Sequence, residues 1–208
     1  EIEAPFILST IAMSDNVDKN LYSSVCVDDR KESEKAVKFL CDKGHKKIAV
    51  LAAGKSDQSI SKLRIEGYRN ALKSKGIDIN EKLIRHTKNN ENIQVMENGY
   101  KLMNELLESG EEFTAVYSIS DSMAIGACKA ILDSGKRIPQ DYSVVGFDGL
   151  DITYYYNPSI TTIRQPVEAM ARETTKILFD LINNKATNQH KVFEAELVER
   201  ESTLKLSK

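Results

Sequence analysis

The sequence predicts an α/β fold built from parallel sheets flanked by helices. Short apolar runs of strand length alternate along the chain with segments whose apolar residues recur at helical spacing. A glycine closes several of these helical segments, as expected where a residue with positive φ ends a helix; the glycines are Gly44, Gly76, Gly110 and Gly135. Repeated βα order favours a parallel sheet, because each helix carries the chain back across a face of the sheet.

The first half of the chain supplies strands and two helices. Strands are expected at 5–11, 23–28 and 47–53, with a shorter one at 84–87, and helices at about 31–43 and 60–75. The inward faces predicted from the apolar spacing are Ala36, Val37, Leu40 and Cys41 in the first helix and Leu63, Tyr68, Ala71 and Leu72 in the second.

The second half continues the same order. The spacing of Ile93, Met96, Tyr100, Met103 and Leu107 predicts a helix that ends near Gly110. The elements expected after it are strands at 114–120, 143–147 and 159–165, helices at about 121–134 and 167–183, a polar loop at 183–191, and a last strand at 192–200. Alternation of apolar and polar residues predicts that last strand.

The composition is that of a globular protein with a balanced charge. Of the 208 residues, 41% are hydrophobic and 29% are charged, and the formal net charge is -2. This balance does not favour DNA binding by the chain itself, and no apolar run approaches the ~18 residues of a membrane-spanning helix. Cys26, Cys41 and Cys128 are far apart and odd in number, so we expect reduced thiols, as in the cytoplasm.

No catalytic signature stands out. The sequence contains no Gly-x-Ser-x-Gly, Walker or Gly-x-Gly-x-x-Gly motif, and His86 and His190 have no nucleophile nearby in sequence. The chain is therefore not expected to be an enzyme, and no metal or cofactor is predicted. The alternative is an enzyme that holds Mg²⁺ on the aspartates at its strand ends, which elemental analysis would reveal.

Polar residues gather where the predicted strands end. In an open α/β sheet this edge is where ligands bind. The residues concerned are Asp28 and Asp29 after the second strand, Arg64 in the first turn of a helix, Ser120 and Asp121 at a strand-to-helix junction, and Asp148 directly after 143–147. Asp29, Ser120 or Asp121 could instead cap helices, and Arg64 could be an ordinary surface residue. Asp148 is harder to explain structurally, because an unpaired carboxylate at the mouth of a buried strand is costly.

Five segments occur in the order and at the spacing of one family of bacterial regulators. They are "LCDKGHKKIAVLAA", "LRIEGYRNAL", "TAVYSISDSMAIGACKAILDSGKRIPQDYSVVGFDG", "PSITTIRQP" and "ELVEREST". By these motifs the chain resembles the lac/gal repressor (LacI/GalR) family over nearly its whole length, the catabolite control protein being a similar relative. The resemblance implies the effector-sensing core of a transcription regulator.

The resemblance also implies a two-lobed core like that of periplasmic sugar-binding proteins. Carried onto this sequence, 44–165 and 194–208 form the C-terminal lobe, and 1–43 and 166–193 form a partial N-terminal lobe. The chain would cross between lobes near Lys43-Gly44, Gln165-Pro166 and Phe193-Glu194. The family's helix-turn-helix domain, its hinge helix and the first half of its N-terminal lobe have no counterpart here. We therefore expect an incomplete N-terminal lobe and a piece of a longer protein.

Site residues follow from the same resemblance. Arg64, Asp148, Ser120 and Asp121 would bind the effector in the cleft between the lobes, with Arg64 donating in a fork and Asp148 accepting from hydroxyl groups. Ile125 and Tyr156 match interface positions of a homodimer; Tyr154, Tyr155 and Tyr156 could equally be core or cleft aromatics.

Three departures leave the identity of the effector open. The family's usual Asn-Asp is Ser120-Asp121 here, a glycine, Gly149, follows Asp148, and the familiar Val-Asp-Asn reads Val27-Asp28-Asp29. A serine hydroxyl lacks the paired donor and acceptor of an amide, and Asp29 replaces an amide by a charge.

The implied effector is a sugar or a sugar phosphate. The implied partners are operator DNA, bound through the absent helix-turn-helix domain, and a second copy of the chain; a protein corepressor is left open. The alternative is an exported, periplasmic-type sugar-binding protein of a transporter, with a signal peptide upstream in place of the DNA-binding domain. The segments "RIPQDYSVVGFDG" and "ELVEREST" favour the regulator.

Overall fold

The structure, a computed structural model, describes residues 5–10, 17–54, 60–87, 95–183 and 187–206. It confirms the α/β fold and divides the chain into two compact units. Unit 1 consists of Glu1–Asp28 and Gln165–Ala195, and unit 2 consists of Asp29–Arg164 and Glu196–Lys208.

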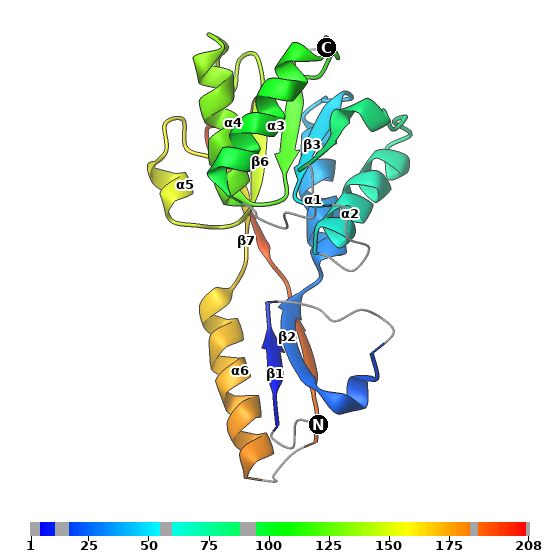
Figure 1. Ribbon diagram of the computed structural model, residues 1–208, viewed down its shortest axis with the longest axis vertical. Helices are drawn as coiled ribbons and strands as arrows, with labels where there is room; N and C mark the ends of the chain where they lie inside the picture. Colours follow the sequence, from blue (N-terminus) through cyan, green and yellow to red (C-terminus); the bar gives the residue numbers. More distant parts are fainter. Residues whose placement is uncertain (1–4, 11–16, 55–59, 88–94, 184–186, 207–208) are drawn as a thin grey trace. The chain divides into compact units, whose positions relative to one another are not determined.

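Unit 1 contains a three-stranded parallel sheet and one long helix. The sheet order is β1-β2-β8. The elements are β1 (Ile7–Ser9), a 3-10 turn η1 (Lys19–Leu21), β2 (Ser23–Val27), α6 (Val167–Ile182) and β8 (His190–Phe193). Helix α6 packs against β1 and β2 (Figure 1). β2 is the central strand of the sheet and is buried throughout.

Unit 2 contains a six-stranded sheet in the order β4-β3-β5-β6-β7-β9. Its strands are β3 (Ile48–Ala52), β4 (Ile84–His86), β5 (Ala115–Ser118), β6 (Ser143–Asp148), β7 (Thr161–Arg164) and β9 (Glu196–Val198). All neighbours are parallel except β7 and β9, which run antiparallel. The central strands read as continuous apolar runs because helices cover both faces of the sheet.

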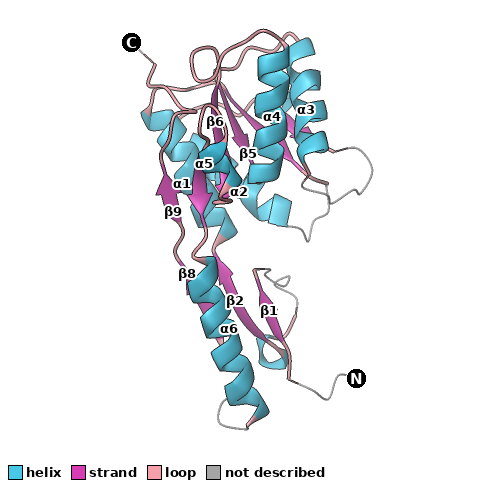
Figure 2. Cartoon of the chain, turned by 90° about the vertical axis from the view of Figure 1, so that its left-hand side faces the viewer, coloured by secondary structure: helices cyan, strands magenta, loops and turns pink. Residues whose placement is uncertain are grey.

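The helices of unit 2 form two pairs, one on each face of the sheet. α1 (Asp29–Asp42) packs against α2 (Ile60–Ser74), and α3 (Met96–Glu108) packs against α4 (Asp121–Asp133). Figure 2 shows β5 and β6 between the two pairs. A 3-10 turn η2 (Glu81–Leu83) and a short helix α5 (Ile152–Tyr155) complete the unit.

Glycine allows the close contact within each helix pair. A Cβ on Gly67 of α2 would lie 2.3 Å from the carbonyl oxygen of Arg30 on α1, and one on Gly99 of α3 would lie 2.0 Å from that of Met123 on α4. Any larger residue would push the paired helices apart, so these two positions fix how α2 and α3 sit.

The prediction of one last strand over 192–200 is wrong. The segment contains two strands in different sheets, β8 and β9, which are separated at Glu194-Ala195. Alternation of polar and apolar residues continues across the break and therefore does not reveal it. The polar loop predicted at 183–191 is likewise shorter than expected, because β8 begins at His190. Ile11 and Ile93, which contributed to two predictions, lie outside the described residues.

The first predicted lobe boundary also differs from the division seen here. It was expected at Lys43-Gly44, whereas the compact units divide at Asp28 and Asp29. The reason is that α1 packs against α2, β5 and β7, which are all parts of unit 2. The other two divisions fall close to the expected crossings at Gln165-Pro166 and Phe193-Glu194.

Within the described ranges, no helix is both long and apolar enough to cross a membrane. The same part of the chain contains no group of three or more His, Cys, Asp or Glu residues placed to hold a metal ion. All three cysteines are free thiols; Cys26 and Cys128 are buried, and burial raises the pKa of the half-buried Cys41 to about 11.

Candidate functional site

Arg64 lies on the buried face of α2. Ser61, Arg64, Tyr68 and Ala71 follow one another at helical spacing and all face the interior, and Arg64 is only 3% exposed. The interpretation of Arg64 as a surface residue is therefore wrong. Leu63, expected to point inward, is only partly buried, so the arginine takes the position that the apolar pattern assigned to its neighbour.

Three groups hold the guanidinium of Arg64. Its Nε donates to Asp29 Oδ1 at 2.7 Å, and Asp29 is itself only 2% exposed. Its Nη1 donates to the carbonyl oxygen of Ile119 and, at 3.4 Å, to Asp148 Oδ1. The structure thus brings together Arg64 and Asp148, the two residues on which the predicted site depends.

One side of the Arg64 fork stays available. In the described part of the chain, no protein group accepts a hydrogen bond from Nη2, whereas Nε and Nη1 are both engaged. A guanidinium has five N–H donors and no acceptor. Arg64 can therefore offer the donors of Nη2 to a bound molecule without giving up its bonds to the protein.

Asp148 has an unusual backbone conformation. It is the last residue of β6, its φ is +122°, and Gly149 follows with φ of +83°. A positive φ is strained for a residue with a side chain, and such strain concentrates at functional sites. A Cβ on Gly149 would lie 2.6 Å from the Cα of Arg164 on β7, so only glycine fits after Asp148.

Asp121, the first residue of α4, supports the turn after β6 from the face of the sheet that α3 and α4 cover. Its Oδ2 accepts hydrogen bonds from the backbone N–H groups of Gly149 and Leu150, both at 2.7 Å, and its Oδ1 accepts from the Thr162 hydroxyl at 2.6 Å. Burial raises the pKa of Asp121 to about 7, against the effect of these three donors. With no exposed surface, Asp121 lies beneath the turn that carries Asp148.

Ser120 acts as the N-cap of α4. Its hydroxyl accepts from the backbone N–H of Met123 at 3.3 Å, and its side chain is buried. The capping alternative therefore accounts for Ser120. Ser120 and Asp121 therefore both make hydrogen bonds within the protein.

The site lies at the carboxyl edge of the unit 2 sheet. Asp148 ends β6, Ile119 follows β5, and Asp29 opens α1. An acidic residue in the first turn of a helix interacts favourably with the helix dipole, and Asp29 occupies such a position while it accepts a hydrogen bond from Arg64. The site presents the N–H donors of Arg64 Nη2 next to the partly exposed carboxylate of Asp148. This arrangement suits a molecule with adjacent hydroxyl groups.

The predicted interface residues lie elsewhere in unit 2. Ile125 is buried on α4, and Tyr156 is half-buried after α5, where burial raises its pKa to about 12. Tyr154 and Tyr155 are 63% and 80% exposed. The suggestion that these two tyrosines belong to the core is therefore wrong.

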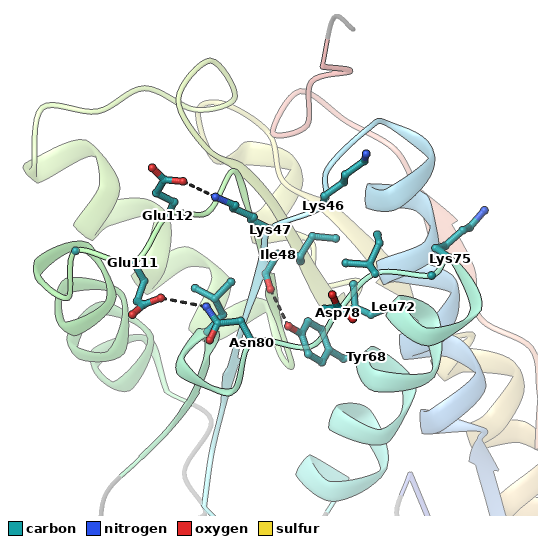
Figure 3. Close-up of a pocket in the computed structure, with 14 residues that line it drawn as sticks. Lys46, Lys47, Ile48, Tyr68, Leu72, Lys75, Asp78, Asn80, Glu111 and Glu112 are labelled. Atoms are coloured by element: carbon teal, nitrogen blue, oxygen red, sulfur yellow. Dashed lines mark hydrogen bonds and ion pairs between the residues drawn. The ribbon is translucent and has the colours of Figure 1, made fainter.

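A separate depression of about 710 Å³ lies at the opposite, amino edge of the same sheet (Figure 3). Its polar groups are largely bonded to one another. Lys47 pairs with Glu112, Asn80 donates to Glu111, and Tyr68 donates to the backbone of Ile48. None of the predicted site residues lines this depression.

Three residues of the site were not assigned roles in advance. Asp29 was considered only as a possible cap or as a departure from the family pattern, because its contact with Arg64 depends on how α1 packs against α2. The pairing of Phe147 with the guanidinium, at 3.6 Å between the ring centroid and Arg64 Cζ, has no signal in the sequence. Nor does the bond from Thr162 to Asp121, because it depends on strand order.

Comparison with known proteins identifies the family of the chain. The model of the periplasmic binding protein-like domain matches residues 37–203, so the chain belongs to that family. The transcriptional regulator MalR of Clostridium butyricum is 39% identical over 202 residues, which cover 97% of this chain and 58% of MalR.

Two solved structures extend the comparison. A complex of the transcriptional regulator CelR with cellobiose has a TM-score of 0.85 and 30% identity, covering 95% of this chain and 58% of that one. A LacI family regulator from Enterococcus faecium with bound ribose has a TM-score of 0.85 and 28% identity, covering 98% and 72%.

These relatives confirm the resemblance to the lac/gal regulators. They are regulators and not transport proteins, which speaks against the exported alternative. The chain spans only 58% of the length of MalR and corresponds to the effector-binding part of such regulators.

Proposed function

We propose that this chain is the small-molecule-sensing and dimerisation part of a bacterial transcriptional regulator, with a sugar or a sugar phosphate as its effector. The observation that carries the proposal is the pair formed by Arg64 and Asp148, in which a buried guanidinium keeps Nη2 available beside a partly exposed carboxylate. The relatives solved with cellobiose and ribose support a sugar as the class of ligand.

Arg64 and Asp148 make different hydrogen bonds to the effector. Nη2 of Arg64 donates to oxygen atoms of the effector, and the carboxylate of Asp148 accepts from its hydroxyl groups. Hydrogen bonds to charged groups are worth about 1.5–3 kcal/mol each. Two such contacts discriminate between sugars, because a missing hydroxyl leaves a charged group without its partner. Ser120 and Asp121 position these residues and contribute no direct contact.

Isothermal titration calorimetry tests the site. The full-length protein is titrated with neutral sugars and sugar phosphates, and the ligand that binds is then titrated into the Arg64→Ala and Asp148→Ala variants. We expect each variant to lose at least tenfold in affinity. Unchanged affinity in both variants would refute the assignment of the site.

The relatives support the rest of the proposal. The whole protein acts in the cytoplasm, is not an enzyme, and binds operator DNA through a domain outside this chain, with a protein corepressor as an open further partner. An effector changes operator affinity only if it binds the two functional states with different affinity.

Dimerisation is proposed through the region of Ile125 and Tyr156, with the exposed Tyr155 next to Tyr156 in the chain. Sedimentation velocity tests it with Tyr155→Asp and Tyr156→Ala, and with Tyr142→Ala as a control, because the ring of Tyr142 stacks on Phe113. Dissociation of the first two variants, with an intact control, is the expected result.

A further inference from the structure

The turn after β6, which carries Asp148, is supported from two sides. On one side Asp121 accepts hydrogen bonds from the backbone N–H groups of Gly149 and Leu150, both at 2.7 Å. On the other side lies Arg164, the partner of Asp148 in the parallel pairing of β6 and β7. A Cβ on Gly149 would lie 2.5 Å from Cγ of Arg164 and 2.6 Å from its Cα and Cβ. The backbone of Gly149 therefore packs directly against the side-chain stem of Arg164.

Glu196 fixes the orientation of that stem. It is the partner of Arg164 in the antiparallel pairing of β7 and β9, and its Oε2 accepts a hydrogen bond from Arg164 Nη2 at 2.6 Å. The two side chains are 51% and 65% exposed, and exposed ion pairs contribute little to stability. What the pair does determine is where the stem of Arg164 lies over Gly149.

Arg164 and Glu196 also lie at two places where the chain leaves and re-enters unit 2. Arg164 is the last residue of the segment Asp29–Arg164, and Glu196 is the first residue of the segment Glu196–Lys208. The pair thus joins the ends of these two segments. A change at either end can reach Gly149 through Arg164.

We propose that Arg164 and Glu196 form a brace that holds Asp148 in the conformation required for effector binding and couples the site to the two segment ends. The inference rests on the proposed function and names residues that regulate the same site. Asp148 has a strained φ of +122°, and a strained backbone persists only where its surroundings hold it. Without the stem of Arg164, the turn loses its support on the β7 side, and the carboxylate of Asp148 moves away from Arg64. Arg164 and Glu196 act through Gly149, so both are positioning residues.

Hydrogen exchange followed by mass spectrometry tests the brace without a ligand. The full-length protein is compared with its Arg164→Ala and Glu196→Ala variants in peptides that contain Gly149 and Leu150. We expect exchange to be about fivefold faster in both variants, because local opening of the turn costs less free energy. Arg164→Lys should stay within about twofold of wild type, because an ammonium group on a flexible stem can replace the single bond from Nη2 to Glu196.

Calorimetry tests whether the brace serves the effector. The same proteins are titrated with ribose, cellobiose, glucose and their phosphates. For the ligand that binds wild type, we expect affinity to fall at least about threefold in Arg164→Ala and Glu196→Ala, and less than about twofold in Arg164→Lys. Coupling between two sites is reciprocal, so this ligand should also slow exchange in peptides from β9 of wild type, and not in those of Arg164→Ala.

Arg137→Ala is the matched control. It removes an arginine from another exposed ion pair, with Asp141, which precedes the amino end of β6. Exchange and affinity should both match wild type, and the same changes here as in Arg164→Ala overturn the proposal. Unchanged exchange in Arg164→Ala overturns it as well. Faster exchange with unchanged affinity overturns the role of the brace in effector binding and leaves the proposed function standing. If none of these ligands binds the wild-type protein, the proposed function fails, and the inference fails with it.

Discussion

The ring of Phe147 lies against the guanidinium of Arg64, with 3.6 Å between the ring centroid and Arg64 Cζ. The same strand thus supplies both the surface that holds the arginine and, one residue later, the carboxylate beside it. Adjacent residues of a strand point to opposite faces, so Asp148 can face the ligand side only because its backbone leaves the strand with positive φ.

Replacing Phe147 tests this support. Phe147→Leu removes the π-face and leaves the guanidinium free to tilt. A cation–π contact is worth about 0.5–2 kcal/mol, so we expect the affinity for the sugar that binds wild type to fall about three- to tenfold in calorimetry. Phe113→Leu is the control, because Phe113 is also buried but packs on Tyr142 at 4.6 Å, away from the site. Both variants should lose stability, and an equal loss of affinity in both would contradict the role of Phe147.

Arg64→Lys keeps the charge but removes the fork. A lysine cannot reach Asp29, the Ile119 carbonyl and a ligand at once. We expect the free energy of unfolding, measured in urea, to fall by about 1–3 kcal/mol, because a buried carboxylate loses its partner, and the sugar affinity to fall at least tenfold. Arg69→Lys on the same helix, whose pair with Glu81 is largely exposed, should cost less than about 1 kcal/mol. Equal losses in the two variants would show that Arg64 has no special role.

Much of this site follows from the sequence, because strand ends and motif spacing are local properties. Arg64 and Asp148 were assigned from the resemblance, and the polar ends of strands pointed to the same edge of the sheet. Asp29, Phe147 and Thr162 depend on which strands and helices become neighbours, which no local pattern specifies. Ser120 and Asp121 were assigned to the effector from the same resemblance, and both are buried and hydrogen-bonded within the protein.

In the fold, too, local features were predicted and features that depend on distant contacts were missed. Most helices and strands were predicted because their apolar spacing is regular. The break at Glu194-Ala195 was missed because two consecutive strands with the same alternation enter different sheets. The place of α1 in unit 2 was missed as well, since its contact with α2 depends on Gly67, which the helical pattern treats as an ordinary interior position.

Asp121 makes the stability of the protein depend on pH. Its pKa is raised by burial to about 7 from a usual value near 3.8, so the folded state binds more protons than the unfolded state between these values. Its contribution to stability is therefore full below about pH 4 and is lost as the pH rises towards 7. Asp121→Asn mimics the protonated form. It should reduce the pH dependence of the free energy of unfolding, measured in urea from pH 4 to pH 8.

A matched variant separates this effect from a general change of charge. Asp133 also lies on α4, but a hydrogen bond from Lys129 lowers the pKa of its carboxyl. It therefore stays ionised in both folded and unfolded states above pH 5. Asp133→Asn should not change the slope of the free energy of unfolding against pH in that range. An unchanged slope in Asp121→Asn would contradict the assignment of Asp121 as the buried acid.

The two helix pairs allow stability to be separated from binding. In Gly67→Ala the new Cβ would meet the Arg30 carbonyl oxygen at 2.3 Å, and in Gly99→Ala it would meet that of Met123 at 2.0 Å. Backbone atoms cannot rotate away as a side chain could, so the helices must separate. Alanine gains about 1 kcal/mol of helix propensity over glycine, which does not offset such overpacking, and both variants should lose about 1–3 kcal/mol in urea unfolding.

Binding should distinguish the two variants. Moving α2 away from α1 shifts Arg64 away from Asp29, so Gly67→Ala should weaken sugar binding at least fivefold in calorimetry. Moving α3 affects the opposite face of the sheet, and Gly99→Ala should bind within twofold of wild type. If Gly67→Ala lost stability and kept full affinity, the spacing between α1 and α2 would not control the site, because Arg64 would keep its orientation without Asp29.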